Sequence, residues 1–140
     1  MKILMPVDGS DYTKRMLGYV AAQGDWLAKP HDVLFLTVVP AIPAYAAGFL
    51  DRATLDDYYA EQAQQVLGPV CTFARQQLWR FDAVHRHGIV ADAIAECAAA
   101  GNVGLIVMGS HGHGALVSMV LGSVATGVLA RCKTPVLLVR

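Results

Sequence analysis

The sequence is poor in charge and lacks the features typical of membrane, secreted or nucleic-acid-binding proteins. Only 16% of its 140 residues are charged, and 11 basic residues balance 11 acidic ones. A neutral chain lacks the positive field that binding to a phosphate backbone requires. No apolar run approaches the roughly 18 residues that span a bilayer, and residues 1–10 lack the apolar core of a signal peptide. We therefore expect a cytoplasmic protein with neither a nucleic-acid nor a membrane partner.

Cysteine is scarce as well. Cys71, Cys97 and Cys132 lie far apart and form no CxxC pair, which argues against a disulfide framework and a zinc knuckle.

Apolar residues, in contrast, make up 55% of the chain, enough for a substantial core. The length predicts a single domain over residues 1–140. The neutral, apolar composition also makes the chain a candidate for self-association.

Short apolar runs alternate with helical patterns along the whole chain. Strands are expected at residues 2–7, 33–39, 81–87, 103–109 and 135–139. Helices are expected from Ser10 or Asp11, from Arg52 to Trp79 with Gly68 and Pro69 able to kink the helix, and at residues 90–101 and 123–131. Residues 41–51 read as a loop. The alternation predicts an α/β fold, an open parallel five-stranded sheet in a three-layer α/β/α sandwich with right-handed crossovers.

Two strand ends carry residues that suit a binding site. The first strand ends in residues 6–10 (PVDGS) and the fourth in residues 108–112 (MGSHG). Because ligands of open parallel sheets bind outside the carboxyl ends of the strands, we expect the site at this edge.

Glycines after the fourth strand follow a spacing that differs from the common phosphate loops. No glycine precedes a lysine, which excludes a P-loop, and Val117 breaks the GxGxxG pattern begun at Gly112. The observed spacing is Gly109, two residues, Gly112, nine residues, then Gly122 and Ser123. Glycine lets backbone N–H groups approach an anion, and the start of the last helix adds its positive dipole end.

This glycine spacing, together with PVDGS and the closing TPVLLV, resembles the universal stress protein family over the full chain. The resemblance implies an adenine nucleotide α-hydrolase-like fold with strand order 3-2-1-4-5. It also implies a homodimer built through the last strand, from Pro135 to Val139. Because the glycine motif is present, it implies the ATP-binding subtype, with a regulatory or protective role in the stress response and little or no hydrolysis.

The resemblance carries nucleotide contacts over to particular residues. They are Pro6, Val7 and Asp8 at adenine and ribose, Val38 at adenine through its backbone, Gly109 and Gly112 at ribose and phosphates, and Gly122, Ser123 and Val124 at the phosphate tail, with Ser110 and His111 between these contacts. Residues 113–121 depart from the family pattern because they contain no Lys or Arg. Neutralisation of phosphate would rest on backbone N–H groups, His113 and Mg²⁺, so ADP or AMP would fit nearly as well as ATP.

Other interpretations of the same residues stay open. Zinc could bind to His111 with His113, or to His85 with His87. The simpler interpretation is that these histidines are solvated or pack within loops. Asp8 is a candidate Mg²⁺ ligand or base, or else an Asx-turn residue. Ser110 lacks the GxSxG context of a nucleophile. We expect no metal site formed by the protein alone.

Three further alternatives concern function. Residues 41–50 could form a lid over nucleotide or a dimer-facing flap. The chain could be a dimeric interaction module of the same fold that binds no nucleotide. It could also transfer an adenylyl or phosphoryl group, although the motif offers no arginine finger.

Overall fold

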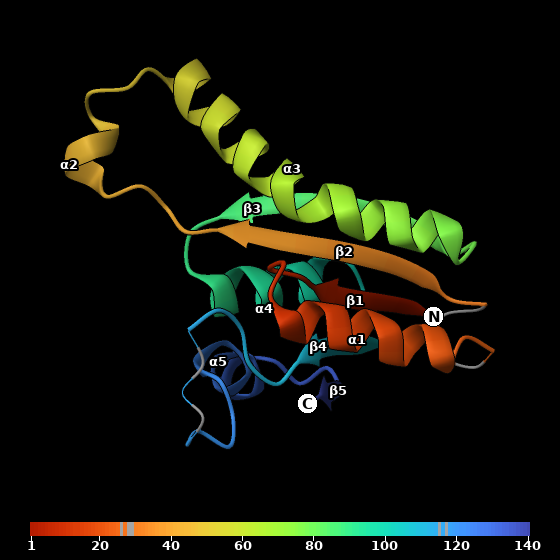
Figure 1. Ribbon diagram of the computed structural model, residues 1–140. Coiled ribbons are helices and arrows are strands. Elements are labelled where there is room, and N and C mark those ends of the chain that lie inside the picture. The colour runs from red at the N-terminus through yellow and green to blue at the C-terminus, as the bar shows by residue number, and fades with distance from the viewer. Residues whose placement is uncertain (26, 28–29, 115, 117) are drawn as a thin grey trace.

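The computed structural model describes residues 1–25, 27, 30–114, 116 and 118–140. Strands and helices alternate along these residues in the order β1 (Lys2–Pro6), α1 (Asp11–Ala22), β2 (Asp32–Val39), α2 (Ala44–Ala47), α3 (Arg52–Gln76), β3 (Arg80–His87), α4 (Val90–Ala100), β4 (Leu105–Gly109), α5 (Ser123–Arg131) and β5 (Val136–Val139). All strand pairs are parallel, and the sheet order is β3-β2-β1-β4-β5. The predicted α/β fold and strand order are confirmed (Figure 1).

Helices cover both faces of the sheet and enclose two apolar cores. Helices α1 and α3 pack on one face, against residues such as Ile3, Phe35 and Val107. Helices α4 and α5 pack on the other, against residues such as Leu36 and Ile106. Alternate strand residues therefore enter opposite cores, which explains why the central strands are apolar on both faces.

Several predicted boundaries differ from the structure. The first strand ends at Pro6 rather than Val7, the fourth begins at Leu105, and the last begins at Val136 rather than Pro135. The long helix ends at Gln76 and continues through Pro69 without a break. Pro69 lies on the exposed face, where water can satisfy the backbone carbonyl that loses its partner.

Residues 41–51 are not entirely loop, because Ala44–Ala47 forms the short helix α2. Alanine is the strongest helix former, which suits this run. Helix α2 buries none of its residues and stands away from the sheet in Figure 1. The nearby Ile42 N–H is tied down, since it donates to the Tyr59 hydroxyl at 3.0 Å.

Helices α4 and α5 approach closely at a glycine. A Cβ added at Gly127 would lie 2.7 Å from the Cβ of Ala91, closer than carbon atoms pack. The position of α5, and therefore of the segment that precedes it, depends on this contact. Gly18 on the exposed face of α1 offers a contrast, because a Cβ there would meet nothing within 4 Å.

We expect Gly127→Ala to destabilise the protein by about 1–3 kcal/mol because the added methyl group overpacks the contact between α4 and α5. The matched variant Gly18→Ala should stabilise it by about 0.5–1 kcal/mol, because alanine is the better helix former where space is open. Urea unfolding of both variants measures the two free energies. Equal stabilisation by both substitutions would contradict the close approach of the helices.

Candidate functional site

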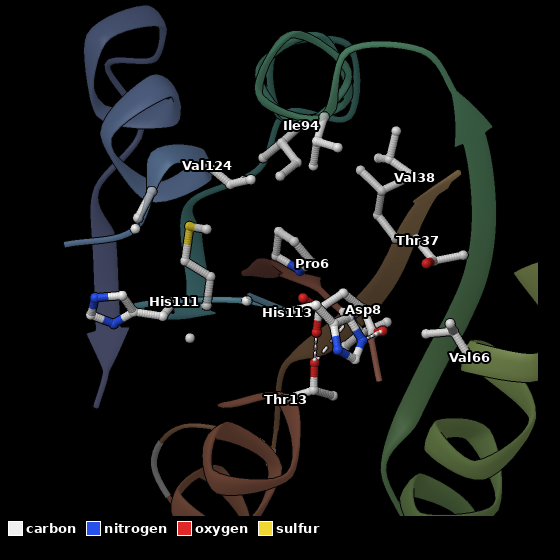
Figure 2. Close-up of a pocket in the computed structure, with 18 of the residues that line it drawn as sticks. Pro6, Asp8, Thr13, Thr37, Val38, Val66, Ile94, His111, His113 and Val124 are labelled. Atoms are coloured by element: carbon white, nitrogen blue, oxygen red, sulfur yellow. Dashed lines mark hydrogen bonds between the residues drawn. The ribbon is translucent and has the colours of Figure 1, made fainter. Parts of the chain in front are cut away.

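A cavity of about 420 Å³ opens at the carboxyl end of the sheet, where β1 and β4 separate. Parallel strands bring their carboxyl ends to one edge, so residues far apart in the sequence meet here (Figure 2). The cavity has an apolar wall on the α4 and α5 side, lined by Leu36, Val38, Val90, Ile94, Met108 and Val124. Its other side faces α1 and α3 and includes Asp8, Thr13, Thr37, Gln62 and Val66.

The backbone of Val38 faces the cavity because β1 ends before β2 does. The register of β1 on β2 stops at Pro6 opposite Leu36, and the Val7 N–H donates to the Leu36 carbonyl at 2.9 Å. Peptide groups of alternate residues point to the same side of a strand, so Val38 presents its N–H and C=O where β1 no longer pairs with them. The strand edge thus offers one donor and one acceptor side by side.

Asp8 is held by the turn between β1 and α1. Its Oδ1 accepts from the Ser10 N–H and from the Thr13 hydroxyl, both at 2.9 Å. Burial raises the pKa of the Asp8 carboxyl, but the hydrogen bonds from Ser10 and Thr13 and the charge of His113 outweigh it, so the pKa lies below its usual value. Asp8 therefore enters the cavity as a fixed carboxylate, and it also makes the predicted Asx-type turn.

The three motif glycines, Gly109, Gly112 and Gly122, lie against other parts of the chain. An added Cβ would come within 2.7 Å of the Tyr12 Cβ at Gly109, 2.6 Å of the Asp8 Oδ2 at Gly112, and 2.9 Å of the Ser110 oxygen at Gly122. The Gly122 N–H is already engaged, donating to the Ser110 carbonyl at 2.8 Å. Gly109 and Gly112 thus let the segment after β4 fold tightly against the start of α1 and the β1–α1 turn, and Gly122 lets the end of the segment return to its beginning.

The two loop histidines have separate structural partners. His111 Nε2 donates to the Met119 carbonyl at 2.8 Å, and its Nδ1 shares a hydrogen bond with the Ser110 hydroxyl at 2.9 Å. His113 Nε2 donates to the Asp8 carbonyl at 2.8 Å, well apart from His111 in Figure 2. Within the described residues, no three His, Cys, Asp or Glu side chains gather closely enough to hold a metal ion.

Helix α5 begins at the cavity with free donors. The first intrahelical bond runs from the Thr126 N–H to the Gly122 carbonyl at 3.0 Å, and the Gly122 cap provides no side-chain acceptor. The N–H groups of Ser123, Val124 and Ala125 therefore precede any helical partner, and all three residues line the cavity. This helix start combines three donors with the positive end of the helix dipole, an arrangement suited to an anion.

The structure brings together all of the predicted site residues except Ser110, whose side chain is buried beneath His111. The lining residues that the sequence did not single out share no motif, because they come from helices or from inside apolar runs. They include Thr13, Thr37, Gln62, Val66, Val90 and Ile94. None of the lining residues that the structure describes is a Lys or Arg. Ala115 and Val117 of the nine-residue segment lie outside the described residues.

Sequence and structure comparisons find relatives that match nearly the whole chain. The protein is 35% identical to a universal stress protein of Thermus aquaticus encoded in the QAH/OAS sulfhydrylase 3′ region, over 99% of this chain and 97% of the relative. Among solved structures, the hypothetical protein MJ0577 superposes with a TM-score of 0.79 at 27% identity, covering 99% of this chain and 94% of that one.

No helix in the described part of the chain is long and apolar enough to cross a membrane.

Other solved structures with the same fold hold adenine nucleotides. A universal stress protein of Archaeoglobus fulgidus is in complex with dAMP; its TM-score is 0.70 at 20% identity, covering 100% of this chain and 98% of that one. An Arabidopsis thaliana family member has AMP bound, with a TM-score of 0.69 at 14% identity over 99% and 90% of the two chains. A further universal stress protein is in complex with cAMP, with a TM-score of 0.65 at 24% identity over 100% and 96%.

The family assignment rests on the full length of the sequence. The model of the universal stress protein family matches residues 1–140. The glycine spacing, the sheet order and the cavity at the strand ends all agree with that match. The chain is therefore a member of the universal stress protein family.

Proposed function

We propose that this protein binds an adenine nucleotide in the cavity and acts as a regulatory or protective protein in the cytoplasmic stress response. In this proposal residues 1–140 act as one domain, and two copies form a homodimer. The observation that carries the proposal is the pairing of two features in one cavity. The strand edge at Val38 suits a base, and the start of α5 suits a phosphate.

The chemistry at Val38 favours adenine over guanine. Adenine presents an amino donor beside a ring-nitrogen acceptor, and these match the C=O and N–H of a single residue. Guanine presents its O6 acceptor in place of the amino group, which would face the Val38 carbonyl unfavourably. The apolar wall formed by Ile94, Met108 and Val124 supports the flat faces of a base.

The charge of the cavity gives little preference for a longer phosphate tail and little catalytic help for hydrolysis. Because the described lining lacks Lys and Arg, phosphate contacts come from the backbone donors of α5 and from His113. The family relatives with AMP, dAMP and cAMP support adenine nucleotides in general. We infer that AMP, ADP and ATP bind with similar affinity, that Mg²⁺ accompanies the longer tails with Asp8 as a candidate ligand, and that hydrolysis is slow or absent.

Substitution of Ser123 provides a test that does not disturb the motif glycines. We expect Ser123→Glu to weaken AMP, ADP and ATP binding by about tenfold or more, through about 1.4 kcal/mol or more of charge repulsion at the phosphate. A negative charge at a helix start stabilises the helix, so the fold should survive. Calorimetry with each nucleotide in the presence of Mg²⁺ measures the affinities.

The neutral variant Ser123→Gln controls for the size of the new side chain and should lose much less affinity. If the unaltered protein binds none of the three nucleotides at millimolar concentration, the nucleotide proposal is wrong. The alternative, an interaction module of the same fold without a nucleotide, would then account for the protein. Equal losses from Ser123→Glu and Ser123→Gln would argue against phosphate at the α5 start.

The edge strand β5 supports the proposed homodimer. Among the described strands it pairs with β4 alone, and its residues Val136, Leu137 and Leu138 are only half-buried. The carbonyls of Pro135 and Val139 accept from β4 and from Ser110 after it, so the peptide groups of Val136 and Leu138 face the free edge. An apolar edge with free donors and acceptors is a liability unless another strand covers it.

We expect Val136→Pro to convert the dimer to a monomer, because it removes an outward N–H at the edge without taking a donor from the β4 ladder. The control Val136→Thr keeps the N–H and the β-branched shape and should stay dimeric. Analytical ultracentrifugation at micromolar concentration gives the oligomeric state. A monomeric unaltered protein, or a Val136→Pro variant that stays dimeric, would exclude β5 as the interface.

A further inference from the structure

Thr37 is a polar residue in an otherwise apolar part of β2. The residue is only 3% exposed, and it lines the cavity. Within the described part of the chain, every fully buried polar side-chain atom has a hydrogen-bond partner, yet no described residue bonds the Thr37 hydroxyl. The hydroxyl must therefore face accessible space, and the space beside this residue is the cavity.

Thr37 lies on the opposite face of the sheet from the apolar wall. Strand residues alternate, and its neighbours Phe35 and Val39 belong to the core under α1 and α3, whereas Leu36 belongs to the core under α4 and α5. Figure 2 accordingly shows Thr37 beside Val66 of α3, with Val38 and Ile94 on the other side of the strand end.

Helix α3 adds a second polar group to this part of the cavity. Gln62 lines it one helical turn before Val66, and α3 packs on β2. The Gln62 amide, like the Thr37 hydroxyl, bonds none of the described residues. Thr37, Gln62 and Val66 therefore bound an α3-side recess that carries a hydroxyl, an amide donor and an amide acceptor, with Asp8 at its edge. None of the contacts assigned above to base or phosphate uses this recess.

We propose that the α3-side recess binds the hydroxyl edge of the ribose and makes the protein selective for ribonucleotides over deoxyribonucleotides. This inference rests on the proposed function, since it takes the base at Val38 and the phosphate at the start of α5. With those two ends fixed, the sugar spans the end of β1 at Asp8. Its hydroxyls are then the polar groups left to face the recess.

Chemical complementarity supports a sugar hydroxyl as the occupant. A hydroxyl both donates and accepts, as do the Thr37 hydroxyl and the Gln62 amide, so each can pair whichever way the proton points. A ligand that lacks the hydroxyl would leave a buried polar group unpaired, and such sites reject the analogue strongly. Proteins of this fold hold AMP, dAMP or cAMP. These nucleotides share the base and differ only at the sugar or its phosphate. A group that distinguishes them must therefore contact the sugar or the phosphate.

Calorimetry with AMP, 2′-deoxy-AMP and 3′-deoxy-AMP tests the recess. We expect the unaltered protein to bind at least one deoxy form about tenfold more weakly than AMP, the effect of one lost hydrogen bond at a buried site. Thr37→Val should weaken the binding of AMP by a similar factor and leave the affinity for that deoxy form unchanged, so that the selectivity disappears. Thr37→Ser keeps the hydroxyl and should therefore keep the selectivity. Gln62→Leu should reduce the selectivity in part.

Thermal unfolding of each variant separates binding from folding, and valine suits a buried strand as well as threonine does. Equal affinity of the unaltered protein for all three nucleotides would overturn the inference while leaving the proposed function intact. Equal weakening of AMP and both deoxy forms by Thr37→Val would also overturn it, because that pattern indicates a structural role. Absence of binding by any nucleotide would instead refute the proposed function, and the inference with it.

Discussion

The site depends on the close packing of the segment after β4 against the turn after β1. Gly109 and Gly112 permit it, because Gly109 meets Tyr12 and Gly112 meets Asp8, whereas Gly122 lets the segment close on its own backbone at Ser110. If this segment stood further out, the start of α5 would move away from the strand edge at Val38. The two walls of the cavity are thus held in register by contacts within the protein, and the glycines serve the packing before they serve any ligand.

The remaining polar groups around the cavity divide into those that hold the structure and those that stay available. The Asp8 Oδ1, the imidazole of His111 and the hydroxyls of Ser110 and Thr13 are engaged in bonds that fix the loops. The backbone donors at the start of α5, the Val38 peptide groups and the Thr37 and Gln62 side chains are available. The available groups are mostly uncharged, so recognition here would depend on geometry more than on long-range attraction.

Much of the fold and part of the site could be predicted from the sequence. The alternation of apolar runs and helical patterns gives the α/β class, and the family resemblance gives the sheet order and about half of the residues that line the cavity. Periodicity could not predict that α3 passes through Pro69, because that depends on which face of the helix meets solvent. Nor could it predict the partners of His111 and Ser110, which come from a loop closure that only the folded chain defines.

Thr37 illustrates the same limit and also a signal that could have been used. In the run VLFLTVV it is the single polar residue, and a polar residue in a buried strand needs a partner. The sequence alone does not say whether that partner is another residue or a ligand. The structure answers the first half of the question, because no described residue bonds its side chain.

Under the proposed function, the early end of β1 limits how the base preference of this fold can change over evolution. The donor and acceptor at position 38 belong to the main chain, so every residue except proline offers the same pair there. Replacing the side chain cannot invert their order. Under the proposed function, a family member built on this fold would inherit its choice of base from strand lengths, whereas the α3-side recess, formed by side chains such as Thr37, could differ between members.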